Sequence, residues 1–192
     1  TGPRIPLDPW GQPYVYARPG IFNPDGFDVY CVRGNSRDPS GWIGNWETPY
    51  RLPDAIEGES LKVAARSEGV TGIVQQLATG SIPPNSGGKH LFIRLGGEGA
   101  WAAFALPKIV KPGRYAVTLF PVTSWDYGVA QWQLDGQPLG DAIDGYSPAV
   151  QRRIVTAGQV TIGSGPHELR VQVQNRNPQS TGFNAGLDAI LF

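Results

Sequence analysis

Hydrophobic and polar residues alternate with a period of two in many short stretches of this chain, the pattern of β-strands that bury one face. The stretch AQWQL at residues 130–134 predicts a half-buried strand, because its apolar residues alternate with two glutamines. Residues 115–120 place apolar side chains on both faces, which predicts a strand covered on both sides. Asp135-Gly136 favours a tight hairpin turn after the second strand, since both residues tolerate positive φ.

Similar alternation recurs from residue 56 onward, and no stretch shows the period of an amphipathic helix. Strands are expected at residues 56–63, 69–77, 90–95, 100–106, 152–157, 159–162, 167–175 and 187–192. The 26 glycines and 18 prolines fit a chain that turns often between short strands. The sequence therefore predicts a mainly β protein, either a β-sandwich or a jelly roll.

The charge and the cysteine content argue against several classes of protein. The 192 residues include 16 Lys and Arg and 16 Asp and Glu, so the net charge is zero, and no basic stripe is visible. We therefore expect no binding to nucleic acid or to anionic membrane surfaces. The single cysteine, Cys31, excludes an internal disulfide framework and is expected to be a small buried hydrophobic residue.

The chain begins at Thr1 and contains no methionine, so we expect it to be part of a longer translation product. The sequence has no run of eighteen apolar residues and no secretory signal peptide.

Residues 1–46 contain three motifs in a fixed order: DPWGQPYVY at 8–16, FDVY at 27–30 and IGNW at 43–46. Their order and spacing resemble the C-terminal part of type II secretion major pseudopilins. The resemblance implies a small pseudopilin-like β segment at residues 1–50 and an extracytoplasmic location, in the periplasm or at the cell surface. It also implies other pilin-like subunits as partners, and a membrane anchor only through an N-terminal helix that is missing from this sequence. We expect the segment to dock on the rest of the chain, because it lacks that covering helix.

The pseudopilin resemblance also implies a calcium loop before IGNW. Asn35 stands where the family usually has an aspartate, and Asp38 is the carboxylate that remains nearby. Because Ca²⁺ prefers several oxygen ligands, the alternative is a polar loop pinned by Trp42 and Trp46.

Residues 47–56 contain two prolines and are expected to form a linker. The domain boundary is placed within this linker, so residues 51–192 are expected to make up the main domain. Five motifs of this domain occur in a recognisable order: IEGE at 56–59, PGRY at 112–115, QLDG at 133–136, GPHEL at 165–169, and FN with LDAI at 183–190. Together they resemble galactose-binding-like jelly-roll modules, the carbohydrate-binding modules of families 6 and 35.

In such modules a structural calcium is held by glutamates of the first strand and an aspartate of the last. Carried over to this chain, the resemblance implies Glu57, Glu59 and Asp188 as metal ligands. Residues i and i+2 of a strand share a face, which is compatible with such a site. The alternative is that both glutamates lie on the solvated face of an edge strand.

The same families bind sugars through aromatic loop residues and a polar residue just before the last strand. The candidates here are Trp125, Asp126, Tyr127 and Asn184. Aromatic rings suit the C–H faces of a pyranose, and carboxylate and amide groups fix hydroxyl directions. Alternatively, Trp125 or Tyr127 packs against the N-terminal segment or plugs the edge of the sandwich. Ala185-Gly186 is an insertion relative to the family and places Asn184 further from Leu187.

No nucleophile elbow, zinc-protease motif or P-loop occurs, and the two histidines are far apart in sequence. Asp141 and Asp144 are an alternative carboxylate pair for glycoside hydrolysis, but aspartates at this spacing ordinarily form turns. We therefore expect no enzyme activity. The leading hypothesis is a non-catalytic extracytoplasmic module that binds a glycan or polysaccharide. The alternatives are a structural pilin head without a sugar site and an accessory module of a larger polysaccharide-degrading enzyme.

Overall fold

A computed structural model describes residues 6–20, 22–23, 25–32, 42–45, 51–68, 70–76, 85–107 and 111–192. The described chain is almost entirely β-structure, with two short 3-10 turns, η2 (Gly58–Ser60) and η3 (Ser86–Gly88). Its described part contains no helix that is long and apolar enough to cross a membrane.

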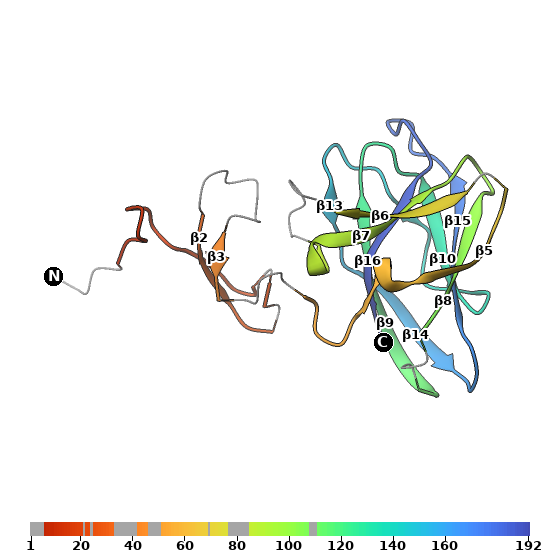
Figure 1. The fold of residues 1–192 in the computed structure, drawn as a ribbon, viewed down its shortest axis with the longest axis horizontal. Helices are drawn as coiled ribbons and strands as arrows, with labels where there is room; N and C mark the ends of the chain where they lie inside the picture. The colour runs from red at the N-terminus through yellow and green to blue at the C-terminus, as the bar shows by residue number, and fades with distance from the viewer. Residues whose placement is uncertain are drawn as a thin grey trace.

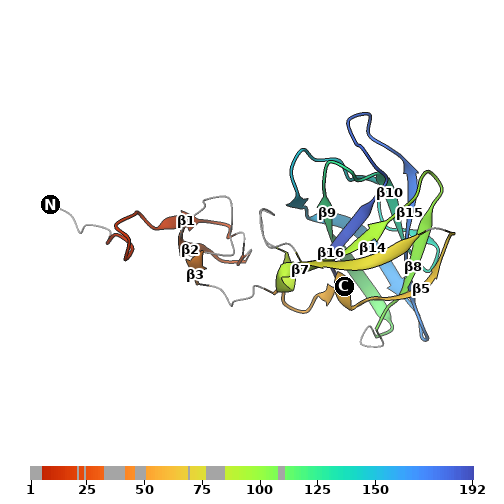
Figure 2. The same ribbon diagram turned by 45° about the horizontal axis from the view of Figure 1, so that its top comes forward.

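The N-terminal segment forms a small antiparallel sheet beside the rest of the molecule (Figures 1 and 2). Its strands are β1 (Val15–Ala17), β2 (Asp28–Cys31) and β3 (Ile43–Gly44). The side chain of Asp28 is fully buried and accepts hydrogen bonds from the Phe22 and Asn23 amides. Asn45 holds β3 to β2 by accepting from the Val29 amide and donating to the Phe27 carbonyl. The pseudopilin-like motifs thus build a local fold through their polar side chains.

The rest of the chain is a β-sandwich of the jelly-roll type. One sheet contains β5 (Lys62–Arg66), β8 (Trp101–Ala105), β10 (Val129–Leu134), β11 (Gln137–Pro138), β12 (Ile143–Asp144) and β15 (Glu168–Asn175). The other contains β4 (Ile56–Glu57), β6 (Thr71–Gln76), β7 (Lys89–Arg94), β9 (Gly113–Thr123), β13 (Gln151–Arg152), β14 (Val155–Ile162) and β16 (Ala185–Leu191).

The main paths run β11-β10-β15-β8-β5 in the first sheet and β13-β9-β16-β7-β6 in the second. Neighbouring strands of both paths pair antiparallel, and the sheets lie face to face in Figure 1. Side chains from both sheets fill the space between them, among them the fully buried Phe104, Leu119, Trp132 and Leu169.

Several sequence predictions are confirmed. Ala130, Trp132 and Leu134 are buried while the two glutamines between them are half-buried. Asp135 and Gly136 have φ values of 49° and 80°, as the predicted tight turn requires.

The predicted strand at residues 56–63 is wrong in one respect. After Glu57 the chain enters the 3-10 turn η2 and resumes as β5 at Lys62. Gly58 permits this turn to press against β16, because a Cβ at this position would lie 2.1 Å from the Leu187 carbonyl oxygen. The Ser60 hydroxyl closes the turn by donating to the Glu57 carbonyl at 2.7 Å. Glu57 and Glu59 are therefore not neighbours on one strand face.

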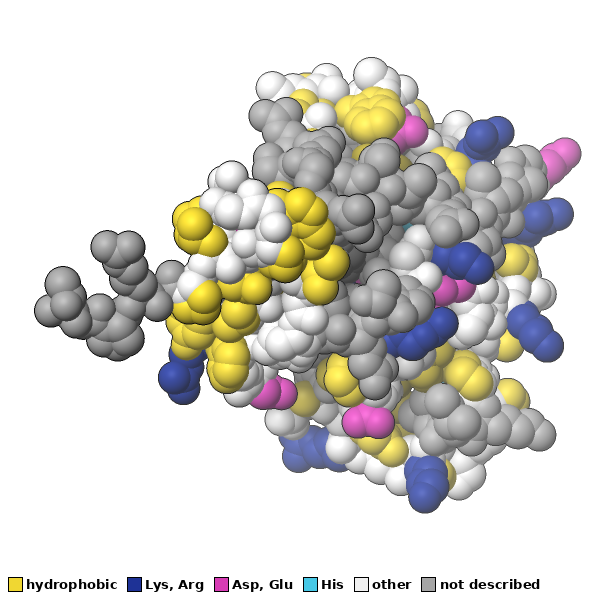
Figure 3. All heavy atoms as spheres, turned by 60° about the vertical axis from the view of Figure 1, so that its left-hand side comes forward, with side chains coloured by type: hydrophobic (Ala, Val, Ile, Leu, Met, Phe, Trp, Pro, Cys, Tyr) yellow, Lys and Arg dark blue, Asp and Glu magenta, His cyan; other side chains and the backbone are white. Residues whose placement is uncertain are grey.

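The N-terminal segment keeps an apolar face exposed. Its large exposed hydrophobic side chains are Leu7, Trp10, Tyr14, Tyr16, Phe27 and Ile43. Figure 3 shows hydrophobic side chains gathered on this side of the molecule. The expected docking of this apolar surface on the sandwich is therefore not seen among the described residues.

Candidate functional site

The loop of residues 124–128 crosses from β9 in one sheet to β10 in the other, at one end of the sandwich. Backbone hydrogen bonds fix it to a second loop, residues 180–184, which precedes β16. The Thr181 amide donates to the Trp125 carbonyl at 2.9 Å, and the Asn184 amide donates to the Asp126 carbonyl at 3.1 Å. Gly128 donates to the Asn184 carbonyl at 2.9 Å. Both loops are therefore held in one arrangement by the backbone itself.

Glycines allow this close approach. A Cβ on Gly182 would lie 2.6 Å from the Asp126 carbonyl oxygen, and one on Gly145 would lie 2.7 Å from the Gly128 carbonyl oxygen. Real Cβ atoms essentially never come this close to another heavy atom, so a side chain at Gly182 would push residues 180–184 away from the loop, and one at Gly145 would push away the segment after β12.

The loop presents one aromatic side chain to solvent. Trp125 is 51% exposed. Beside it, the Asn184 side-chain amide donates to Asp126 Oδ2 at 2.9 Å, and both residues are partly buried. The insertion Ala185-Gly186 therefore does not displace Asn184 from the loop, because these residues begin β16 and leave Asn184 paired with Asp126.

Tyr127 is placed differently from the prediction. It is only 3% exposed and packs with Phe92 and Val122, so it forms no exposed pair with Trp125. Its side chain packs on the face of the second sheet that points away from the main core. There its hydroxyl lies 3.2 Å from His90 Nε2.

His90 extends this contact into a buried chain. Its Nδ1 lies 3.1 Å from the Asn85 side-chain amide nitrogen. Burial lowers the pKa of His90 to about 4, so the imidazole is neutral near pH 7. The two ring nitrogens thus link the Asn85 side chain to the Tyr127 hydroxyl. The buried contacts from Asn85 through His90 to Tyr127 thus support the Trp125 loop on its buried side.

The space beneath the loop is small. A cavity of about 10 Å³ lies among residues such as Tyr127, Trp132 and Gly186, and it has room for about one water molecule. A larger ligand would have to bind on the outer surface, where Trp125 and the Asp126–Asn184 pair lie.

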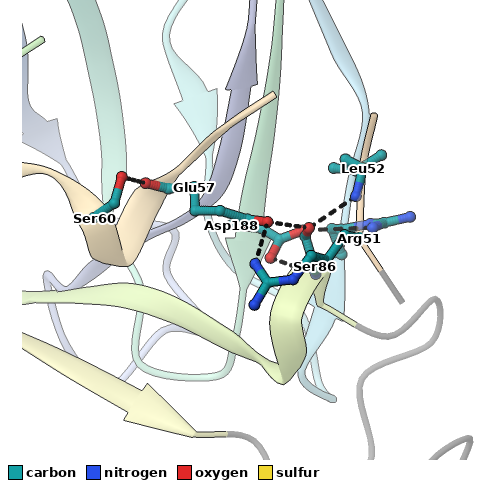
Figure 4. Close-up of polar contacts among 7 residues, drawn as sticks. Arg51, Leu52, Glu57, Ser60, Ser86 and Asp188 are labelled. Atoms are coloured by element: carbon teal, nitrogen blue, oxygen red, sulfur yellow. Dashed lines mark hydrogen bonds and ion pairs between the residues drawn. The ribbon is translucent and has the colours of Figure 1, made fainter. Parts of the chain in front are cut away.

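Two of the predicted metal ligands, Asp188 and Glu57, already have hydrogen-bond and ion-pair partners. Asp188 is fully buried, and both of its oxygens are occupied: Oδ1 accepts from the Ser86 amide at 2.8 Å, and Oδ2 pairs with Arg152 Nη1 at 3.4 Å. Glu57 Oε1 accepts from the Ser86 hydroxyl at 2.7 Å and lies 3.2 Å from Arg51 Nη1 (Figure 4). Burial raises the pKa of the Asp188 carboxyl well above its ordinary value and the charge of Glu57 adds to the rise, whereas Arg152 and the Ser86 amide offset only part of it.

Glu59 lies near this cluster but in the turn η2. Burial raises its pKa, and the charge of Glu57 adds to the effect, while Lys89 and Arg51 act against it. Among the described residues, no group of three or more His, Cys, Asp or Glu side chains is arranged to hold a metal ion. Glu57, Glu59 and Asp188 therefore do not fit a calcium site in this geometry, since basic side chains and backbone amides already occupy two of them.

Sequence reasoning missed Ser86 and Arg152, which organise these carboxylates. They are 102 and 36 residues away from Asp188 in the chain, and no local motif marks the pairing. The other candidate calcium loop, with Asn35, Asp38 and Trp46, lies outside the described residues. Trp42 stacks on Tyr30 with ring centroids 4.6 Å apart.

The alternative catalytic aspartates have turn-forming contacts. Asp144 accepts from the Tyr146 amide at 2.9 Å and from the Asn177 side chain at 2.7 Å. His167 pairs with Asp135 at 2.7 Å, in a contact that joins two turns. Through these contacts Asp144, Asp135 and His167 stabilise loops and turns.

No known protein-family profile matches the chain. The type II secretion system core protein G of Pseudomonas aeruginosa is 40% identical over 48 residues, which are 23% of this chain and 32% of that protein. The match thus spans about a third of the length of that curated relative.

Among solved structures, a Paenibacillus xanthan lyase is similar with a TM-score of 0.61 and 26% identity. The similar region covers 75% of this chain and 13% of the lyase, so the chain corresponds to a small part of that enzyme. A family 35 carbohydrate-binding module from an environmental isolate has a TM-score of 0.45 and 11% identity over 71% of this chain and 89% of the module.

Proposed function

We propose that the jelly roll is a non-catalytic module that binds a glycan or polysaccharide at the Trp125 loop. The observation that carries this proposal is an exposed tryptophan on a loop that is already fixed by backbone hydrogen bonds, next to the Asp126–Asn184 pair. The similarity to part of a xanthan lyase supports it as a fold-level precedent.

The chemistry of this surface suits a sugar. A flat aromatic face packs against the apolar C–H face of a pyranose ring, and a paired carboxylate and amide offer acceptors and donors to hydroxyl groups. Because the loop is held in place before binding, little conformational entropy would be lost when the ligand binds. In this proposal Trp125, Asp126 and Asn184 contact the ligand, while Tyr127 positions the loop from beneath.

We assign the protein an extracytoplasmic location. The 48-residue match to a type II secretion core protein supports this assignment, and it makes other pilin-like subunits candidate partners of the N-terminal segment. A full-length form would be anchored by a helix that precedes this sequence.

A structural role in subunit contact is the second candidate function. The observation that favours it is the group of exposed hydrophobic side chains on the N-terminal segment, Leu7, Trp10, Tyr14, Tyr16, Phe27 and Ile43. The two functions are compatible, because they use different parts of the chain.

The glycan site is tested by screening neutral and acidic polysaccharides and oligosaccharides with the wild type, Trp125→Ala and Trp10→Ala. Trp10 is a matched control, since it is 48% exposed but belongs to the N-terminal segment. We expect Trp125→Ala to weaken binding about tenfold or more, equivalent to about 1.4 kcal/mol, with an unchanged melting temperature. Trp10→Ala is expected to bind like the wild type.

Two outcomes would count against the glycan site. The first is the absence of binding to every glycan, which would leave the structural role as the main function. The second is equal binding by the wild type and Trp125→Ala, which would place the sugar elsewhere.

A further inference from the structure

Asp188 lies in an irregularity of the central strand β16. The pairing of β16 with β9 shifts register between Leu187 and Ala189, so residue 188 is the extra residue of a β-bulge. Such a bulge re-aims a side chain, and here the carboxylate reaches the Ser86 amide and the Arg152 guanidinium. A fully buried carboxylate requires partners of this kind, because an isolated buried charge is strongly unfavourable.

Arg152 is built into the same site from the neighbouring edge of the sheet. It belongs to β13, which pairs with β9 at Val122. Its side chain is 1% exposed, and its guanidinium lies 5.6 Å from the centre of the Phe120 ring. The packing leaves this cation beside Asp188 as a fixed part of the core.

The charges of the cluster balance without a metal. Asp188 pairs with Arg152, and Glu57 pairs with Arg51. Glu59 interacts electrostatically with Lys89 and Arg51. Three acidic side chains thus face three basic side chains, so the cluster has no excess negative charge for a divalent cation to neutralise.

We infer that the Arg152 guanidinium is the internal counter-ion of Asp188 and takes the place that a structural divalent cation would need, so that the jelly roll is stable without calcium. Removal of Arg152 would free Asp188 Oδ2. Among the described residues, Glu57 Oε2 and Glu59 Oε2 are buried and have no hydrogen-bond partner, so they would be available with it as oxygen ligands. The variant would then gain a response to calcium that the wild type lacks.

The test is thermal unfolding of the full chain in excess CaCl₂ and in excess EDTA. We expect the melting temperature of the wild type to agree within about 1 °C between the two conditions, because a ligand that does not bind the folded state cannot stabilise it. Arg152→Ala is expected to melt at a lower temperature in EDTA and to gain about 5 °C or more in calcium. Calcium titration calorimetry of both proteins reports binding independently of stability.

Two further variants serve as controls. Arg153→Ala removes a neighbouring exposed arginine that contacts the Asp144 carbonyl, and it is expected to show no calcium response. The double variant Arg152→Met with Asp188→Asn replaces the ion pair by neutral groups of similar size, and it is also expected to ignore calcium. Because the double variant leaves no unpaired buried charge at this position, it can be measured even if Arg152→Ala is poorly stable.

Calcium stabilisation of the wild type by several degrees would overturn the inference. It would also be overturned by a folded Arg152→Ala without calcium binding, or by an equal response of Arg153→Ala. If Arg152→Ala does not fold in EDTA, recovery of its folding in calcium supports the inference, and failure to recover contradicts it.

Discussion

Individual buried polar residues give this molecule part of its pH dependence. His90 is held neutral in the folded protein by burial, which lowers its pKa to about 4 from an ordinary value of 6.5. Its two ring nitrogens link Asn85 to Tyr127, so the residue connects the strand β7 to the loop that carries Trp125. Protonation would place a charge in this apolar setting.

We therefore predict that the contribution of His90 to stability falls as the pH decreases from about 6.5 to about 4, whereas the raised pKa of Asp188 acts in the opposite direction. In this range the unfolded chain binds a proton at His90 and the folded protein does not, so protonation favours unfolding. The full effect is about 3 kcal/mol, from 1.36 kcal/mol for each unit of the pKa difference. Urea unfolding at several pH values measures it, with His90→Gln as a non-titrating comparison.

The difference between the wild type and His90→Gln isolates this residue from the carboxylates that titrate in the same range. The free energy of unfolding of the wild type minus that of the variant should decrease as the pH falls from about 6.5 to about 4. Parallel pH profiles for the two proteins would show that His90 is not buried as described.

Residue-scale patterns also decide which site residues are visible from the sequence. Trp125 could be selected because it lies in a loop with no apolar alternation to explain it. Tyr127 could not be distinguished from it, since the direction of a loop side chain depends on contacts with Phe92 and His90 from another strand. Asn184 was found only through a family motif.

At the scale of elements, the site depends on two loops whose backbones touch. Gly182 allows the loop of residues 180–184 to lie against Asp126, and the Ser180 hydroxyl reinforces the contact by donating to the Tyr127 carbonyl at 2.8 Å. The exposed tryptophan is therefore positioned by neighbouring backbone and by a side chain below it.

We predict that Gly182→Ala weakens glycan binding without unfolding the sandwich. The new methyl group would meet the Asp126 carbonyl oxygen at 2.6 Å, so the two loops must separate and Trp125 must shift. A loss of about tenfold or more in affinity is expected from such a displacement. Binding measurements on Gly182→Ala and on Gly163→Ala give the comparison, because Gly163 has open space around its missing Cβ.

Unchanged affinity of Gly182→Ala would mean that the relative position of the two loops does not matter for binding. Equal losses in both glycine variants would point to a general effect on the fold.

Elements with simple alternation were predictable, and elements that depend on distant partners were not. The strand β10 and the Asp135-Gly136 turn follow from local sequence. The turn η2 interrupts an equally regular alternation, because Gly58 packs on the Leu187 carbonyl of a strand more than a hundred residues away. The same long-range packing brings Arg152 to Asp188 in place of the predicted cation.

The whole molecule consists of a small N-terminal sheet and a large sandwich. The segment that leads into the sandwich already contacts it at Arg51 and Leu52. The Leu52 amide donates to the Ser86 hydroxyl at 2.9 Å, and Arg51 pairs with Glu57. Arg51 and Leu52 thus both contact residues of the sandwich.

We predict that residues 51–192 fold on their own and retain the glycan affinity of the full chain. The hydrogen bond from Leu52 fixes Ser86, which in turn contacts Glu57 and Asp188, so a fragment that begins at Ile56 should melt at a lower temperature. A loss of about 1 kcal/mol is expected for such a hydrogen bond. Thermal unfolding and glycan titration of both fragments measure these effects.

Equal melting temperatures of the two fragments would show that residues 51–55 contribute nothing to the sandwich. A failure of residues 51–192 to fold would show that the N-terminal sheet is part of its core.

The central claim is that Trp125 forms the face on which a sugar packs. The most direct measurement is an NMR titration of the six tryptophan indole N–H signals with the tightest-binding oligosaccharide of the screen, with Trp125→Ala used to assign its signal. We expect a large, saturable shift of the Trp125 signal and none for Trp10. A saturable titration in which the Trp125 signal stays in place would contradict it.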